Sequence, residues 1–202
     1  MLDSYIRLLI DPPLNRMARV ALRAGLSANR VTLAGCLCGM ICFLFLTLQA
    51  YGAALMFLAL GRLFDGIDGA MARQSAQGAT DLGGFYDTVC DFVFYAGFPF
   101  FFAMGAADVS LPAAFLIFSF MGTASSFLAY AVIAAKRGIN HERNGKKSFY
   151  YLEGLMEGTE TIFAFVLICL LPAHFTVIAV VSGILCWITT AGRVMRGVRD
   201  FS

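Results

Sequence analysis

The sequence predicts an all-α integral membrane protein, with six transmembrane helices preceded by a cytoplasmic juxtamembrane amphipathic helix. Of its 202 residues, 59% are hydrophobic and only 14% are charged, well below the ~25% charged content of a soluble domain. Its mean hydropathy is +0.77. Apolar runs that approach the ~20 residues of a membrane span begin near Val31, Tyr51, Phe85, Leu111, Phe149 and Thr176. Six spans therefore account for nearly the whole chain.

The segment before the first span is basic and amphipathic. Residues 15–24 place arginines at helical spacing with apolar residues between them, as in a helix that lies on a membrane surface. These arginines either set the topology or attract an anionic lipid substrate. Gly25 is suited to end this helix, and Ser27 or Asn29 to cap the first span. We therefore divide the chain into an N-terminal cytoplasmic or interfacial segment, residues 1–28, and a six-helix membrane domain, residues 29–202.

Basic residues fall on one side of the predicted spans. They precede the first span, close the second, and follow the fourth and the sixth: Arg7, Arg16, Arg19, Arg23, Arg30, Arg62, Arg73, Lys136, Arg137, Arg143, Lys146, Lys147, Arg193, Arg196 and Arg199. Short loops that are rich in Lys and Arg stay in the cytoplasm. We therefore expect a multi-pass protein with both termini on the cytoplasmic side.

The segment DGIDGAMARQSAQGATDLGGFYDTVCD, residues 65–91, places carboxylates among membrane helices. Asp65 and Asp68 are three residues apart on the second predicted span, and Asp87 and Asp91 are four apart on the third, so each pair shares a helix face. Because the turn between the two helices is short, we expect antiparallel neighbours whose four carboxylates converge. Carboxylates at this depth normally pair with cations or line a polar cavity.

Four unpaired carboxylates would repel one another at low dielectric, and divalent cations would remove this cost. Hard oxygen ligands favour Mg²⁺, Mn²⁺ or Ca²⁺. At 1.5 Å per residue, Asp65 lies ~12 Å from Arg73, so we expect the cluster near the cytoplasmic edge of the hydrocarbon region. Arg73 at that rim is suited to hold a pyrophosphate, although a topology charge explains a single arginine as well. The cysteines lie in apolar runs and are interpreted as buried hydrophobes.

This spacing resembles the signature of the CDP-alcohol phosphotransferase family. The match runs over Asp65-x2-Asp68-Gly69-x2-Ala72-Arg73-x9-Gly83-x3-Asp87-x3-Asp91. The six membrane helices, the cytoplasmic termini and the amphipathic helix are also similar to the family, so the resemblance covers the whole chain. Residues 27–32 resemble the family's Pro-Asn-x-x-Thr start of the first span, with Ala28 in place of proline. Residues 154–161 are similar to a stretch in small bacterial inner-membrane members.

The resemblance implies a chemistry and a set of ligands. Metal binding, to Mg²⁺ or Mn²⁺, would fall to Asp65, Asp68, Asp87 and Asp91. Asp91 would also be the catalytic base that deprotonates an acceptor hydroxyl, which attacks the β-phosphorus of a CDP-alcohol and releases CMP. The CDP-binding wall would comprise Asn29, Thr32, Asp65, Gly69, Ala72, Arg73 and Gly83. The implied donor is a CDP-alcohol lipid, most often CDP-diacylglycerol, and the implied process is phospholipid biosynthesis at the cytoplasmic face of the bacterial inner membrane.

The acceptor, a small polar alcohol, is not fixed by this motif. Two groups of charged residues are candidates for its binding: the basic Lys136, Arg137, Lys146 and Lys147, and the acidic Glu153, Glu157 and Glu160. The basic group favours a phosphorylated or carboxylated alcohol. The acidic group, which forms a stripe on the fifth predicted span, favours an amine or a polyol. Topology and surface ion pairing explain the same residues without an acceptor.

Other functions are compatible with intramembrane carboxylates. A membrane cation channel or carrier also uses them, but it does not need the Gly-Ala-Arg spacing. An intramembrane aspartyl protease is disfavoured because its Gly-x-Gly-Asp motif is missing, whereas a catalytically dead scaffold remains open. No nucleic-acid partner is expected. The expected partners are the lipid bilayer, the two substrates and, from the family resemblance, a second copy in a homodimer.

Overall fold

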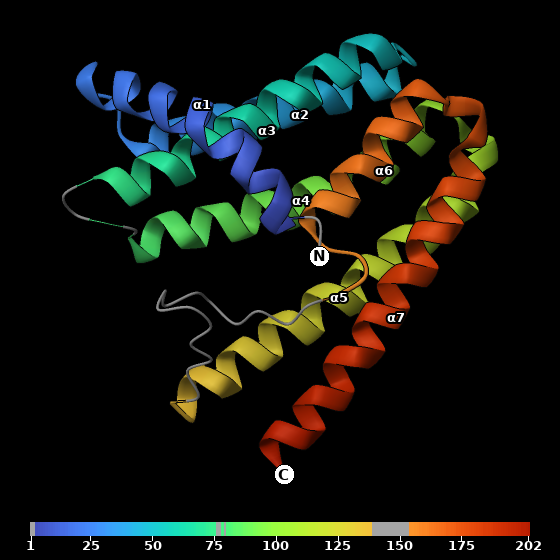
Figure 1. Cartoon of the computed structure of the whole chain (residues 1–202). Helices are drawn as coiled ribbons and strands as arrows, with labels where there is room; N and C mark the ends of the chain where they lie inside the picture. Colours follow the sequence, from blue (N-terminus) through green and yellow to red (C-terminus); the bar gives the residue numbers. More distant parts are fainter. Residues whose placement is uncertain (1–2, 76–77, 79, 139–153) are drawn as a thin grey trace.

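The computed structural model describes residues 3–75, 78, 80–138 and 154–202, and the backbone alone for residues 3–9. The described residues form helices joined by short connections (Figure 1). The helices are α1 (Asp3–Arg23), α2 (Ala28–Thr47), α3 (Tyr51–Gln74), α4 (Asp81–Gly105), α5 (Ser110–Lys136), α6 (Gly158–Leu170) and α7 (Phe175–Phe201). Two short 3-10 helices, η1 (Ala107–Val109) and η2 (Pro172–His174), precede α5 and α7.

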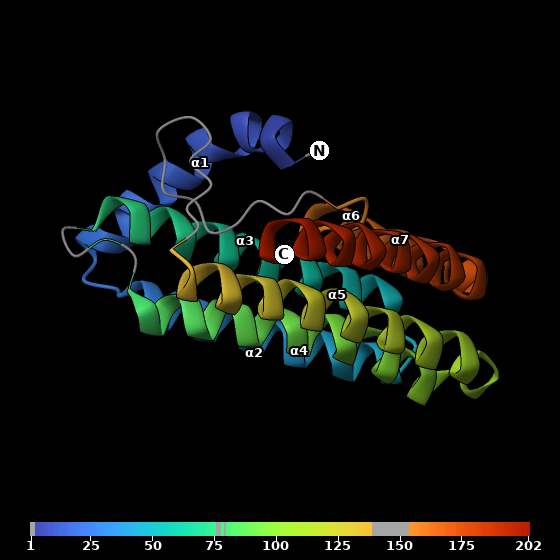
Figure 2. The ribbon, with the colours of Figure 1, turned by 90° about the horizontal axis from the view of Figure 1, so that it is seen from below.

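The helices from α2 to α7 form a closed ring. α2 packs against α3 and α4, α4 against α5, and α5 against α7, while α6 packs against α7 and α3. In Figure 2, α3, α6 and α7 form one layer and α2, α4 and α5 the other. Buried phenylalanines fill the interior: Phe98 stacks on Phe165 with ring centroids 4.0 Å apart, and Phe102 stacks on Phe175 at 4.2 Å. This aromatic core packs α4 against α6 and α7 and so fixes how the ring of helices closes.

Helices α2 and α3 approach closely because each presents a glycine to the other. A Cβ atom on Gly35 would lie 3.2 Å from the Cβ of Phe64 and 3.3 Å from the carbonyl oxygen of Gly61. Small residues at such contacts allow helix backbones to pack tightly. The packing sets Thr32, near the start of α2, beside Asp68 of α3.

Within the described residues, four helical segments are long and apolar enough to cross a membrane by length and composition: Ala28–Thr47, Asp81–Gly105, Ala107–Lys136 and Pro172–Phe201. Their most apolar windows are only 22% to 39% buried inside the protein, so most of their side chains face outward, as suits a lipid environment. α3 has the length of a span, with 24 residues, but charged residues interrupt its apolar sequence. Four of the predicted spans are thus supported, and the count of six stays a prediction.

The fifth predicted span differs from expectation. Residues 149–153 lie outside the described part, and α6 begins only at Gly158. It has 13 residues, ~20 Å at 1.5 Å per residue, which is shorter than the ~30 Å hydrocarbon core. A capping box sets this start, because the Glu160 side chain accepts from the backbone N–H of Glu157 at 3.2 Å and the Glu157 side chain accepts from Glu160 in return.

Helix α1 starts at Asp3 and is longer than the predicted helix of residues 15–24. Leu14 and Ala18 are buried against α3, so the helix is amphipathic as predicted. Its exposed side chains include Arg16, Arg19 and Arg23. Gly25, with a φ of +76°, follows the helix, and Ser27 takes the N-cap position of α2 without a side-chain hydrogen bond. The location of α1 at a membrane surface stays a prediction.

Candidate active site

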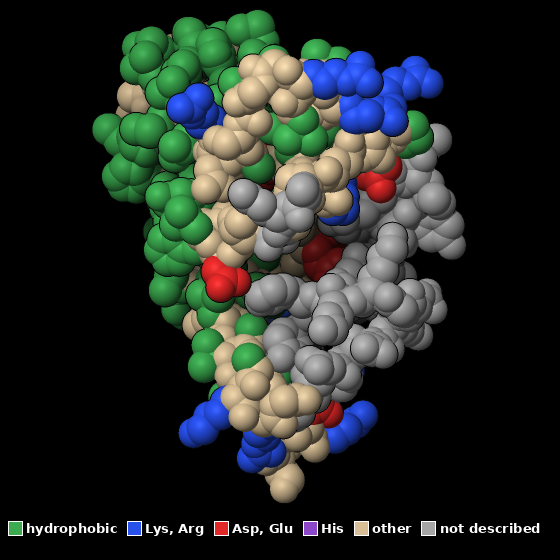
Figure 3. Space-filling view, turned by 90° about the vertical axis from the view of Figure 1, so that its left-hand side faces the viewer, with side chains coloured by type: hydrophobic (Ala, Val, Ile, Leu, Met, Phe, Trp, Pro, Cys, Tyr) green, Lys and Arg blue, Asp and Glu red, His purple; other side chains and the backbone are tan. Residues whose placement is uncertain are grey.

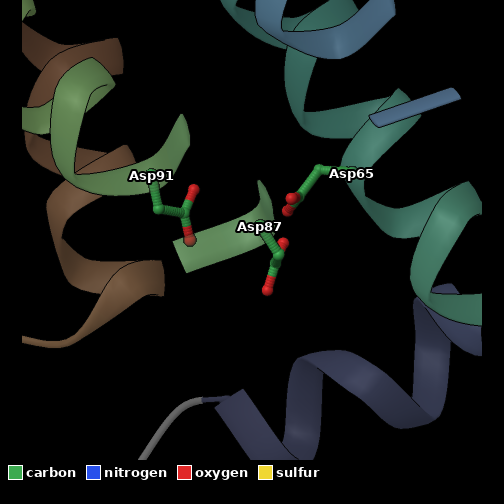
Figure 4. A group of neighbouring side chains, drawn as sticks. All are labelled: Asp65, Asp87 and Asp91. Atoms are coloured by element: carbon green, nitrogen blue, oxygen red, sulfur yellow. The ribbon is translucent and has the colours of Figure 1, made fainter. Parts of the chain in front are cut away.

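Three of the four predicted metal ligands converge at one point. Asp65 of α3 points toward Asp87 and Asp91 of α4, as Figure 4 shows. One carboxylate oxygen from each residue lies within 4.8 Å of the other two. The sequence predicted this contact, because the i, i+4 spacing of the two α4 residues puts them on one helix face. An all-oxygen set at this spacing can hold a hard divalent cation.

Asp68, the fourth predicted ligand, lies beside this group but outside it. Asp68 is only 7% exposed, and its carboxylate lies next to the Thr32 hydroxyl. Among the described residues, its Oδ2 has no hydrogen-bond partner. A buried polar atom without a partner is costly, and a cation in the adjoining space would remove that cost. The donor set and this unpartnered oxygen together fit a divalent metal.

The two acidic helices are not packed neighbours, contrary to the sequence prediction. α3 and α4 run antiparallel through a short turn, as expected (Figure 1). However, each packs mainly on α2, and they make little backbone contact with one another. The prediction was wrong because chain proximity at the turn does not require contact along the helices. The gap between them is where a cavity forms.

The cavity has a volume of about 1200 Å³, large enough for a sizeable ligand. Helices α2, α3 and α4 supply one part of its wall, and all the predicted CDP-binding residues line it: Asn29, Thr32, Asp65, Gly69, Ala72, Arg73 and Gly83. Helices α5 and α7 and the start of α6 supply the other part, which includes Thr123, Phe127, Glu157, Thr159 and Arg193. Figure 3 shows the hollow, with acidic side chains in it. The carboxylates therefore lie where two binding regions meet.

The starts of α2 and α4 meet at Gly83. A Cβ atom there would lie 3.1 Å from Thr80 Oγ1 and 3.3 Å from Asn29 Oδ1. Thr80 in turn caps α4 by accepting from the backbone N–H of Gly83 at 3.1 Å. The glycine keeps this corner of the cavity open for a ligand.

Arg73 lies at the cavity rim, as predicted. Its side chain is 52% exposed, and its Nη2 lies 3.9 Å from Asp11 Oδ1 of α1. Its Nη1 would lie 3.5 Å from a Cβ placed on Gly69. Because an exposed ion pair of this length is weak, the guanidinium is available to phosphate oxygens.

Arg62 is a site residue that the sequence interpretation misplaced. It does not close the second span as a topology charge but lies inside α3, one turn before Asp65. Its Nη1 donates a hydrogen bond to Asp91 Oδ1 at 2.7 Å and lies 3.6 Å from Asp65 Oδ2. Tyr95 also lies beside the Asp91 side chain. The i, i+3 spacing from Asp65 was a signal for this contact.

Arg193 of α7 is a second residue that the sequence interpretation did not place in the site but treated as a topology charge or a surface ion-pair partner of the glutamates. Its Nη1 donates to the carbonyl oxygen of Thr123 at 3.0 Å, and its Cζ lies 5.5 Å from the centre of the Phe127 ring. Its Nε is buried, and no described residue accepts a hydrogen bond from it. Such a donor favours an anionic ligand. Only the packing of α7 on α5 reveals this residue, so no local sequence signal could have identified it.

The two predicted basic acceptor residues that the structure describes do not line the cavity. Lys136 and Arg137 lie at the end of α5, and neither belongs to the described cavity lining. Arg137 instead places its Cζ 5.5 Å from the centre of the Phe201 ring. Lys146 and Lys147 lie outside the described residues.

The predicted acidic stripe is wrong as a helix face. Glu157 precedes α6 rather than lying on it, and both it and Glu160 serve the capping box. Glu157 Oε1 also accepts from the backbone N–H of Gly154 at 2.8 Å. Of the two glutamates, Glu157 lines the cavity. Glu153 lies outside the described residues.

Comparison with known proteins agrees with the motif. The model of the CDP-alcohol phosphatidyltransferase family matches residues 26–195. The chain belongs to this family. It is 47% identical over 198 residues to inner membrane protein YnjF of Escherichia coli K12, a match over 98% of this chain and 95% of that protein. It is also 31% identical over 102 residues to archaetidylinositol phosphate synthase of Pyrococcus horikoshii, over 50% of this chain and 54% of that protein.

Solved structures of a phosphatidylinositol phosphate synthase from Mycobacterium tuberculosis have a similar fold. The structure with CDP-DAG bound gives a TM-score of 0.68 at 20% identity, over 91% of this chain and 92% of that chain. The complex with manganese and citrate gives 0.66 at 20% identity, over 91% and 88%. This similarity concerns the fold, and the site of this chain is argued from its own residues.

Proposed function

We propose that this protein transfers a phosphatidyl group from CDP-diacylglycerol to the hydroxyl of a small polar alcohol, with release of CMP. One observation carries the proposal: three carboxylates within 4.8 Å of one another stand where two binding regions of one cavity meet. Membership of the CDP-alcohol phosphatidyltransferase family supports phosphatidyl transfer in phospholipid synthesis. It also argues against the cation channel or carrier.

The donor region is the wall formed by α2, α3 and α4. The small Gly69, Ala72 and Gly83 leave room for a cytidine and its phosphates, and Arg73 offers a cation at the rim. The mycobacterial structure with CDP-DAG supports this choice of donor. The exposed apolar sides of the spans would leave the acyl chains in lipid.

Mg²⁺ or Mn²⁺ is the proposed cofactor. Asp65, Asp87 and Asp91 are placed to hold it, with Asp68 beside them. When bound, the metal supplies positive charge for the pyrophosphate. The mycobacterial structure with manganese supports this choice.

Asp91 is the proposed catalytic base. Its Oδ1 is held by Arg62 at 2.7 Å, and Tyr95 lies beside the same carboxylate. The carboxylate takes the proton of the acceptor hydroxyl as the oxygen bonds to the β-phosphorus. The bond from this phosphorus to the bridging oxygen then breaks, CMP leaves, and a phosphodiester remains.

The proposed acceptor carries an anionic group such as phosphate. Arg193 is the charged donor in the acceptor region, and its Nε is buried without a partner in the described chain. The glutamates that favoured an amine are engaged in capping α6. The names of two relatives, an archaetidylinositol phosphate synthase and a phosphatidylinositol phosphate synthase, agree with a phosphorylated product.

The membrane arrangement completes the proposal. We infer a multi-pass protein of the bacterial inner membrane with six spans, residues 1–28 as an interfacial segment, and both termini and the active site on the cytoplasmic side. A homodimer is the proposed assembly. The inner-membrane relative from Escherichia coli supports the location.

The direct test incubates the purified protein with CDP-diacylglycerol, Mn²⁺ or Mg²⁺ and a panel of phosphorylated and unphosphorylated alcohols. CMP release and the lipid product are followed. We expect turnover only with metal, and Asp68→Asn should weaken metal and donor binding together. Asp108→Asn, at η1, is the matched control because it does not line the described cavity. Ion flux in liposomes without any nucleotide dependence, together with no CMP release, would support the carrier instead.

A further inference from the structure

Arg62 places a positive charge against the carboxylate group from inside α3. Its Nη1 lies 2.7 Å from Asp91 Oδ1 and 3.6 Å from Asp65 Oδ2, so one guanidinium touches acidic residues of both helices. Its side chain is only 23% exposed. This contact joins α3 and α4, whose backbones make little direct contact with one another. A positive charge in this position interacts with the carboxylates of Asp65 and Asp91. It does not serve to set the membrane topology.

The surroundings hold Arg62 in place. Its Cζ lies 5.1 Å from the centre of the Phe94 ring, which is buried. Its Nε is also buried, and within the described residues it has no hydrogen-bond partner. The carboxylates therefore provide its polar contacts, and a ring that offers cation–π attraction lies behind it. The guanidinium is thus fixed on one oxygen of Asp91.

We propose that Arg62 is a positioning residue with two linked effects: it orients the carboxylate of Asp91 for proton transfer, and it competes with the divalent metal for Asp65 and Asp91. The inference rests on the proposed function. Both effects depend on the same contact. Removing the guanidinium should lower turnover, because the Asp91 carboxylate is no longer oriented, and should raise metal affinity, because the competing positive charge is gone.

This pair of changes separates positioning from a merely structural role. Loss of a packing residue loosens the site, so it lowers metal affinity and turnover together. Loss of a positive charge removes repulsion of the metal and leaves the carboxylates without their cation. The metal-free protein should then be less stable, and added metal should restore more of its stability than in the wild type.

The test compares Arg62→Gln and Arg62→Lys with Arg199→Gln, an exposed arginine of α7 that controls for the loss of one charge. Mn²⁺ affinity is measured without substrate by electron paramagnetic resonance. Unfolding temperature is measured in EDTA and in Mn²⁺, and kcat and KM are obtained from CMP release. Wild-type and variant proteins are used as full-length chains in the same detergent.

For Arg62→Gln we expect Mn²⁺ binding to tighten about 30-fold, the effect of a unit charge on a divalent cation at 4 Å even under aqueous screening. We expect kcat to fall about 10- to 100-fold, as for other residues that orient a metal ligand. Arg62→Lys keeps the charge but not the planar fork, so its Mn²⁺ affinity should stay near wild type while kcat falls. Arg199→Gln should change neither.

Unchanged or weaker Mn²⁺ binding in Arg62→Gln would overturn the inference, as would a wild-type kcat in Arg62→Lys. The second variant decides the question if the first does not fold. Failure of the proposed function looks different, because the wild type would then release no CMP with any acceptor. In that case the Mn²⁺ titration and the EDTA unfolding temperatures still test Arg62.

Discussion

Replacing Asp91 by asparagine removes the proposed base while changing the shape of the site little. The amide keeps an oxygen that can accept the 2.7 Å hydrogen bond from Arg62, so α3 and α4 stay linked. What is lost is one negative charge and the ability to take a proton. General base catalysis contributes about 10²- to 10⁴-fold, so we expect kcat for CMP release to fall by that factor.

Donor binding should survive this substitution in large part. Asp65 and Asp87 still face one another, with Asp68 beside them, and none of the glycines on the donor wall is altered. The assay pairs initial rates of CMP release with equilibrium binding of CDP-diacylglycerol in Mn²⁺. Asp81→Asn is the matched control, since it lies on the same helix but outside the described cavity lining.

The reasoning fails if Asp91→Asn keeps turnover within about tenfold of the wild type, below the range expected of a general base. It also fails if donor binding is lost as completely as turnover. The second result would make Asp91 a metal ligand alone and would require another base.

Three further predictions concern the walls and the core. Gly83→Ala should raise KM for the donor, because its Cβ would lie 3.3 Å from Asn29 Oδ1 at the cavity corner and overpacking costs about 1 to 3 kcal/mol. Gly192→Ala is the control, because nothing lies within 4 Å of that position and it is outside the described cavity lining. Arg193→Gln should raise KM for a phosphorylated acceptor about 10- to 100-fold, since a hydrogen bond to a charged group contributes about 1.5 to 3 kcal/mol, and an equal rise for an unphosphorylated alcohol would contradict this. Phe165→Ala should lower the free energy of unfolding by about 3 to 5 kcal/mol, as measured by denaturant unfolding. The control Phe163→Ala should have little effect, because the Phe163 side chain is 62% exposed.

The acidic cluster could be predicted from sequence because its spacing is local. Two carboxylates three or four residues apart must share a helix face, whatever surrounds the helix. The predicted donor wall, from Asn29 to Gly83, also lines the cavity. The choice of these positions came from the family motif, because bare glycines give no physical signal of a ligand.

The parts that could not be predicted depend on which helices touch. The position of α2 between α3 and α4 is set by close contacts such as Gly35 against Gly61, and such pairs are invisible in a single sequence. Arg193 becomes a candidate only when α7 packs on α5. The capping box at Glu157 lacked the usual local signature, because its N-cap residue is Glu instead of Ser, Thr, Asp or Asn.

The most direct test of the site is anomalous diffraction at the manganese edge, on crystals grown with Mn²⁺ and a CDP-alcohol. The account predicts manganese bound by oxygens of Asp65, Asp87 and Asp91, with the cytidine against the wall that contains Gly83. Manganese bound elsewhere, with these three carboxylates free of metal while the nucleotide is present, would contradict it.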